Sequence, residues 1–323
     1  MNRVIVMHIL IICKANFEPS ELNFQNKRSY IFDQVQELRR QCVNVDLYFI
    51  QGKGIISYFL GAIKLRSFLK KQQFDVVHAH YGYSGLVAGL VSKNPVLVTY
   101  HGTDITEKIS KIISCLSILL SDWNIFVSQG LYNKSLKKPI NRFSVIPCGV
   151  DLDIFHPIDK SNAIERLKWI KGKQRILFSS SFSNPIKNVG LAKKAFAVLG
   201  RKDVEFVELK NRTRDEVALM LNACDVLVLT SFSEGSPQII KEALACNCPI
   251  VTTDVGDIKE VIKNAKNSYV TAFDPIEIAA KISLILESNE RSNGSEHIGY
   301  LSNVNIVKQL IEVYHEVISN RSK

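Results

Sequence analysis

Residues 225–244 read DVLVLTSFSEGSPQIIKEAL, which places a strand, a loop and a helix in direct succession. The strand part, 225–230, is apolar except at its two ends, as expected for a strand buried on both faces of a parallel sheet. We predict that Ser236 caps the helix, that Pro237 is its first residue, and that Gly235 lets the backbone approach a ligand. The free amides at the start of this helix favour an anionic group such as a diphosphate.

Two carboxylates flank this helix start. Glu234 precedes the helix, and Glu242 lies about a turn and a half inside it. Carboxylate oxygens accept hydrogen bonds from neighbouring hydroxyls, so the pair suits the diol of a sugar or a ribose. On this spacing alone, the two residues could equally be a capping glutamate and a solvated one.

The succession of strand and helix recurs along the whole chain. Runs typical of strands lie at 4–12, 45–50, 75–80, 96–100, 124–127, 175–180, 204–209, 225–230, 250–253 and 269–273. Helical patterns separate them, with a capping box at Thr213 and Glu216 and an N-cap followed by proline at Asp274 and Pro275. We therefore predict an α/β fold of two doubly wound Rossmann-like domains that face each other across a ligand-binding cleft.

The length of the chain and a segment with proline and glycine near its middle also indicate two domains. The chain has 323 residues, more than a typical single domain, and proline and glycine interrupt both periodicities between 146 and 157. We predict one domain at 1–155, a second at 156–302 and a helical C-terminal segment at 303–323.

The composition is that of a globular protein, with 46% hydrophobic and 22% charged residues. Its longest apolar runs are about ten residues, well short of the ~20 that span a bilayer, so no transmembrane helix is expected. The seven cysteines form no C-x-x-C pair, and we interpret them as reduced thiols in a cytoplasmic protein.

The net charge of +10 is concentrated in the first half. Residues 1–155 carry 18 basic and 11 acidic residues, whereas residues 156–323 carry 23 and 20. Such a bias suits an anionic partner, which could be a nucleic acid, a phosphorylated acceptor or an acidic membrane surface. The aromatic and basic segment 55–71 is either a membrane-contacting helix or an ordinary domain helix with a solvated lysine end.

Several motifs together resemble one family. The pattern E-G-S-P-Q-x-x-x-E-A at 234–243 is similar to the donor signature of glycosyltransferase family 4, whose members are retaining enzymes of the GT-B fold. The resemblance continues in DVVHAH (75–80), HGTD (101–104), VIPCGVD (145–151), NPIKN (184–188) and CPIVTTDVGDIKEVI (248–262). It covers nearly the whole chain.

The resemblance implies a role for each motif on the donor side. Glu234 would hold the hydroxyls of the transferred sugar, and Glu242 those of the ribose. Lys187 would neutralise the phosphates, which also fits the negative charge that the leaving group gains in the reaction. The alternative is that Lys187 is an ordinary loop lysine. The remaining donor-binding candidates are Asn184, Lys210, Gly235, Ser236 and Pro237.

Three residues are candidates in the first half. His101 follows a strand, and the resemblance implies that it contacts the donor sugar near the reacting centre; the alternative is a histidine bonded to a neighbouring backbone group. His80 and Asp104 are assigned to the acceptor side. His78 and His80 share one face of a strand and could be drawn as metal ligands, but without a third ligand we favour ordinary packing.

The sequence departs from the family at two positions. An arginine commonly stands five residues before the lysine, and here that position is Phe182; Lys210 or Arg212 could compensate. Cys148 replaces the asparagine often found in the motif at 145–151. A non-catalytic nucleotide-sugar-binding partner, and an epimerase or phosphorylase of the same fold, are the alternatives to a transferase.

The resemblance thus implies a metal-independent hexosyltransferase without a cofactor. Its first domain would bind a glycan or polyprenyl-linked acceptor and its second a UDP- or GDP-sugar, with the helix at 303–323 returning to the first domain. The implied setting is cell-surface polysaccharide synthesis, such as capsule or lipopolysaccharide, on the inner face of the plasma membrane and without nucleic acid.

Overall fold

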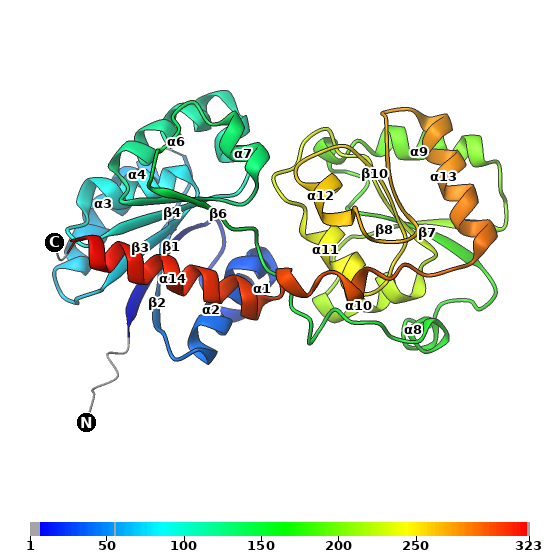
Figure 1. The fold of residues 1–323 in the computed structure, drawn as a ribbon, viewed down its shortest axis with the longest axis horizontal. Helices are drawn as coiled ribbons and strands as arrows, with labels where there is room; N and C mark the ends of the chain where they lie inside the picture. The colour runs from blue at the N-terminus through cyan, green and yellow to red at the C-terminus, as the bar shows by residue number, and fades with distance from the viewer. Residues whose placement is uncertain (1–6, 55, 322–323) are drawn as a thin grey trace. The chain divides into compact units, whose positions relative to one another are not determined.

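The computed structural model describes residues 7–54 and 56–321. The chain forms two compact units, Met1–Gly149 with Asn303–Lys323, and Val150–Ser302. The first boundary therefore lies at Gly149, before the expected residue 155, and the second lies where residues 303–323 were expected to begin. Each unit is a parallel sheet with helices on both faces (Figure 1).

The sheet of the first unit has the strand order β2-β1-β3-β4-β5-β6, and all its pairings are parallel. Its strands are β1 (His8–Ala15), β2 (Asn44–Gln51), β3 (Val76–His80), β4 (Val96–Tyr100), β5 (Trp123–Phe126) and β6 (Phe143–Val145). All but β6 lie on predicted runs. Residues 4–6 of the first predicted run, and residue 55 of the segment 55–71, lie outside the described residues.

Helices cover both faces of this sheet (Figure 1). They are α1 (Glu21–Lys27), α2 (Ser29–Arg40), α3 (Ile56–Leu69), α4 (Gly82–Val91), α5 (Thr103–Thr106), α6 (Lys108–Leu120), α7 (Gln129–Lys134) and α14 (Asn303–Arg321). Helix α14 packs against α2 and β3 of the first unit. Helices α4 and α6 pack closely because α4 offers glycines: a Cβ on Gly85 would lie 2.3 Å from Ser117 Oγ.

The sheet of the second unit has the order β11-β10-β9-β7-β8, again all parallel. Its strands are β7 (Gln174–Phe178), β8 (Val204–Glu208), β9 (Val226–Leu229), β10 (Ile250–Thr253) and β11 (Ser268–Thr271). Its helices are α8 (Lys160–Arg166), α9 (Val189–Leu199), α10 (Arg214–Ala223), α11 (Gln238–Ala245), α12 (Ile258–Ile262) and α13 (Pro275–Ser288), with 3-10 turns η1 (Pro185–Lys187), η2 (Gly294–Glu296) and η3 (Gly299–Leu301). The predicted capping box at Thr213 and Glu216 is present, and Asp274 caps α13.

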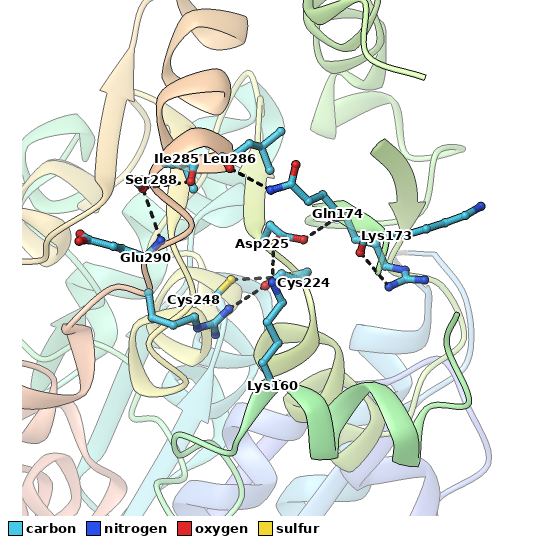
Figure 2. A network of polar contacts seen from close by, with 12 residues as sticks. Lys160, Lys173, Gln174, Cys224, Asp225, Cys248, Ile285, Leu286, Ser288 and Glu290 are labelled. Carbon is cyan, nitrogen blue, oxygen red and sulfur yellow. Dashed lines mark hydrogen bonds and ion pairs between the residues drawn. The ribbon is translucent and has the colours of Figure 1, made fainter. Parts of the chain in front are cut away.

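A polar network fixes the amino-terminal ends of β7 and β9 (Figure 2). Asp225 accepts hydrogen bonds from the Arg175 amide at 2.6 Å and from Lys160 Nζ at 2.5 Å. The free thiols of Cys224 and Cys248 lie beside it, with their sulfur atoms 3.4 Å apart. This network leaves the opposite, carboxyl edge of the sheet to the motif residues.

Within residues 7–54 and 56–321, no helix has the length and apolar character that crossing a bilayer requires.

Candidate active site

Two predicted donor-site residues meet at the carboxyl edge of the second sheet. Lys187 Nζ donates a hydrogen bond to Glu234 Oε1 at 2.6 Å, and Ser231 Oγ donates to the same oxygen at 2.6 Å. The two charged side chains are 20% and 14% exposed. The ion pair is therefore largely shielded from water but still accessible to a ligand.

The backbone after β7 is bonded to the end of β9, which fixes the position of Lys187. Thr230 Oγ1 donates to the carbonyl of Lys187 at 3.1 Å and to that of Asn188 at 2.9 Å. Asn188 adopts the left-handed conformation, with φ of 51°, and the Asn184 side chain accepts from the Ile186 amide at 3.2 Å. Asn184 thus shapes the turn that presents the lysine.

The start of α11 differs from the prediction. The helix begins at Gln238, so Pro237 occupies the N-cap position and no side chain caps the helix. Ser236, predicted as the cap, instead donates its hydroxyl to Asp257 Oδ2 at 2.6 Å. The cap prediction was wrong because a long-range partner competes for the Ser236 hydroxyl.

Asp257 and Gly256 were not singled out from the sequence. Gly256 has φ of 65°, and a Cβ there would lie 2.9 Å from the Gly235 carbonyl oxygen, so only glycine allows the two loops to approach this closely. Asp257 Oδ1 is buried without a hydrogen-bond partner. Burial raises the pKa of Asp257, partly offset by the nearby Lys241 charge. A buried oxygen of this kind is suited to accept a hydrogen bond from a ligand.

Helix α11 carries two further charged residues of the motif. Glu242 is half-buried inside the helix. Lys241, which was not predicted to have a role, is fully buried and donates to Gln238 Oε1 at 3.1 Å.

In this chain, the side chain at the position of the family's arginine is half-buried and packs against the hydrophobic core. The ring of Phe182 stacks on Phe206, with ring centroids 5.1 Å apart. Arg212 bonds Glu216 at 3.2 Å on the surface, and Lys210 is exposed after β8. Among the described residues, Glu234 pairs with Lys187 and Arg212 pairs with Glu216, so neither Arg212 nor Lys210 takes the place of the arginine beside Glu234.

In the first unit, a tight turn presents His101 directly after β4. Gly102 has φ of 149°, a conformation that favours glycine. Asp104 accepts hydrogen bonds from the amides of His101 at 3.1 Å and Gly102 at 2.8 Å. Burial raises the pKa of Asp104 to about 6, although these amide bonds oppose the shift. Asp104 therefore holds the backbone that carries His101.

Three histidines stack at the ends of β3 and β4. His80 Nδ1 lies 2.9 Å from His101 Nε2, and the rings of His78 and His80 are 4.5 Å apart. Both ring nitrogens of His78 are bonded, to Thr99 and to Tyr314, at 2.7 Å each, so they are not available to a metal and the packing interpretation of His78 holds. Burial lowers the pKa of His80 to about 3, which keeps it neutral.

Aromatic residues that the sequence did not indicate surround His101. Tyr30 and Tyr81 lie 5.0 and 4.7 Å from its ring, measured between centroids, and their hydroxyls contact each other. Tyr81 follows β3 with φ of 72°, an uncommon conformation for a large side chain. Cys148 Sγ lies 3.6 Å from His101 Nδ1, so the residue that replaces the family's asparagine contacts the candidate histidine.

Comparison with known proteins identifies the family. The model described as Glycosyltransferase Family 4 matches residues 30–154, and the model described as Glycosyl transferases group 1 matches residues 199–301. N-acetyl-alpha-D-glucosaminyl L-malate synthase of Bacillus anthracis is 24% identical over 302 residues, covering 80% of this chain and 78% of the relative. The Escherichia coli UDP-Gal:alpha-D-GlcNAc-diphosphoundecaprenol alpha-1,3-galactosyltransferase is 26% identical over 271 residues, 69% of each chain.

Solved structures share the fold. Sucrose-phosphate synthase from Thermosynechococcus elongatus superposes with a TM-score of 0.81 at 17% identity, over 97% of this chain and 100% of the other. Anabaena HepE in complex with UDP and glucose superposes with a TM-score of 0.72 at 16% identity, over 96% and 100%. The chain therefore belongs to glycosyltransferase family 4 and is a glycosyltransferase of the GT-B fold.

Proposed function

We propose that the protein transfers one sugar from a UDP- or GDP-sugar to a glycan or polyprenyl-linked acceptor, with retention of configuration at the anomeric carbon. The observation that carries this proposal is the Lys187–Glu234 ion pair beside the amino-terminal end of α11. Two comparisons support it: the E. coli relative is named for a UDP-Gal donor and an undecaprenol-linked acceptor, and HepE was solved with UDP and glucose. We propose synthesis of a cell-surface polysaccharide as its setting.

We assign the donor to the second unit. The first amides of α11 and Lys187 bind the diphosphate, Glu234 accepts from hydroxyls of the transferred sugar, and Glu242 accepts from the ribose. When the bond between the anomeric carbon and the diphosphate breaks, negative charge grows on the departing oxygen, and the fixed Lys187 cation stabilises it. Because Lys187 and the helix amides supply this positive charge, the reaction needs no metal ion or cofactor.

We assign His101 to a hydrogen bond with the reacting sugar. Its ring is held by His80, and its backbone is held by Asp104. His80 and Asp104 therefore act as positioning residues on the acceptor-binding unit, and the neutral state of His80 leaves one ring nitrogen able to donate and the other able to accept.

A surface of the first unit supports a location on the inner face of the plasma membrane. Apolar side chains on α3 and α6 point outward: Ile56 is 72% exposed, Phe59 68% and Ile109 70%. The sequences of α3, α4 and α6 contain no acidic residue, whereas α3 carries Lys64 and Arg66. Apolar residues with flanking cations fit an anionic bilayer.

A donor screen tests the proposed function. The thermal midpoint of the purified protein is measured with UDP, GDP and their sugar conjugates. A ligand at 100 times its dissociation constant should add about 2.7 kcal/mol of stability, so one nucleotide series should raise the midpoint clearly. Loss of that shift in Lys187→Ala would support the assigned site. No shift with any nucleoside diphosphate or nucleotide sugar would contradict the proposal.

A further inference from the structure

A buried lysine lies near the carboxyl end of the first sheet. Lys14, near the end of β1, is only 8% exposed. Its ammonium group donates to Ser57 Oγ and lies 4.4 Å from the centroid of the Tyr58 ring. No carboxylate of residues 7–54 and 56–321 forms an ion pair with Lys14. Burial lowers the pKa of Lys14.

A second cation without a carboxylate partner, Arg28, belongs to the same unit. Arg28 precedes α2, and its Nε atom is buried with no hydrogen-bond partner. Its guanidinium carbon lies 5.4 Å from the centroid of the Tyr81 ring. The described part of the chain offers this guanidinium no ion pair. Burial raises the pKa of Tyr58 and the Arg28 charge partly opposes that shift, so the field of Arg28 reaches the ring that Lys14 contacts.

Buried cations are normally paired, because removing a charge from water costs several kcal/mol. Here the carboxylate among these groups, Asp104, already accepts hydrogen bonds from the backbone amides of His101 and Gly102. Helix α2, twelve residues long, also begins without a side-chain cap, so its first amides add further positive potential. At the carboxyl edge of the first sheet, the described part of the chain therefore offers neither Lys14 nor Arg28 a carboxylate partner.

We infer that Lys14 and Arg28 form an anion site that binds a phosphate or diphosphate group of the acceptor. This inference rests on the proposed function, and it names the chemistry that the first unit recognises. Two sources could supply the group, a lipid-linked diphosphate or a free sugar phosphate.

A neighbouring pocket favours neither source by itself but lets an experiment separate them. The pocket has a volume of about 350 Å³ and is lined by residues that include Tyr48, Phe49, Leu60 and Ser57. Ser57 also bonds Lys14, so an apolar chain attached to the bound phosphate could enter this pocket. A free sugar phosphate would make no use of its apolar walls.

The test is calorimetric titration of the full chain, with UDP or GDP in excess so that the donor site is filled. The probes are inorganic pyrophosphate, farnesyl diphosphate and glucose 1-phosphate. The variants are Lys14→Met, which keeps the length of the buried side chain, and Arg28→Gln; Lys93→Met, at an exposed lysine of the same unit, is the control. Each site variant should weaken the binding of pyrophosphate about tenfold or more, because a hydrogen bond to a charged group is lost.

The outcomes separate the hypotheses. Farnesyl diphosphate binding at least tenfold tighter than pyrophosphate identifies a lipid-linked source, and glucose 1-phosphate binding tighter than both identifies a free sugar phosphate. Equal pyrophosphate affinity in wild type, Lys14→Met and Arg28→Gln overturns the inference. If the nucleotide itself fails to bind, the proposed donor site is contradicted instead. The effect of the Lys14 and Arg28 variants on the affinity for pyrophosphate does not depend on that result.

Discussion

Replacing Lys187 and replacing Glu234 should have different effects on nucleotide binding. At 2.6 Å and an effective dielectric constant of 20, the gross attraction is about 6 kcal/mol. Desolvation of both ions offsets most of it, because burial costs several kcal/mol per charge. The net cost of parting the pair is thus small, and a diphosphate can take Lys187 from Glu234.

Glu234→Ala should therefore leave UDP or GDP affinity unchanged or raise it, since Lys187 loses its competing partner. Lys187→Ala should weaken nucleotide binding about tenfold or more. Both variants should lose sugar transfer by a factor on the order of 10²–10³, because each supports the reacting groups. Calorimetry gives the affinities, and mass spectrometry of the glycosylated acceptor gives the rates.

A surface ion pair of the same unit serves as the control. Glu165 and Lys171 lie 3.4 Å apart with side chains 75% and 71% exposed, so Glu165→Ala should change neither affinity nor rate. Near-normal transfer in both site variants would refute the assignment. If Glu234→Ala lost as much nucleotide affinity as Lys187→Ala, this would refute the idea that the diphosphate replaces Glu234 as the partner of Lys187.

Four further outcomes follow from the structure. Transfer should survive chelation by EDTA, and an absolute requirement for manganese or magnesium would contradict the roles of Lys187 and the α11 amides. Sedimentation with liposomes should show salt-sensitive binding to anionic but not to neutral vesicles. Glutamine substitutions at Lys64, Arg66, Lys70 and Lys71 should weaken this binding. His80 has a pKa of about 3 in the folded protein and stays neutral, whereas in the unfolded chain it gains a proton below about pH 6.5. The free energy of unfolding, measured with urea, should therefore fall by about 2 kcal/mol more between pH 7.5 and 5 in wild type than in His80→Gln. An equal fall in both proteins would contradict the burial of His80 as a neutral ring. Gly85→Ala should destabilise the protein by about 1–3 kcal/mol because the new Cβ meets Ser117. Gly190→Ala has open space around its Cβ and should stabilise the protein by about 0.5–1 kcal/mol. Thermal unfolding of the two variants distinguishes these opposite effects.

The fold was accessible from the sequence because buried parallel strands are short continuous apolar runs. Strands β4 and β10 have the predicted bounds, and other predicted runs differ only at their ends. Strand β6 was missed because its three residues are all only half-buried and belong to a segment interrupted by proline and glycine. Such an edge strand is recognised only through its partner β5.

The candidate site was only partly accessible. Lys187 and Glu234 could be named because each belongs to a motif at a strand end, but their direct contact depends on the order of β7 and β9 in the sheet. Ser236 was misassigned because local capping rules ignore Asp257, which comes from a distant loop. Arg28 and Lys14 carry no local motif; only the structure shows that Lys14 is buried and that Arg28 Nε is buried without a hydrogen-bond partner.

The most direct test of the central claim is the stoichiometry of transfer. The purified protein is incubated with the nucleotide sugar that gives the largest thermal shift and with polyprenyl-diphosphate-linked saccharides in anionic vesicles, and products are followed by mass spectrometry. We expect the acceptor to gain the mass of one sugar for each nucleoside diphosphate released, without added metal, and Lys187→Ala to abolish both products together. Release of nucleoside diphosphate at the same rate without acceptor, or full transfer by Lys187→Ala, would contradict the central claim.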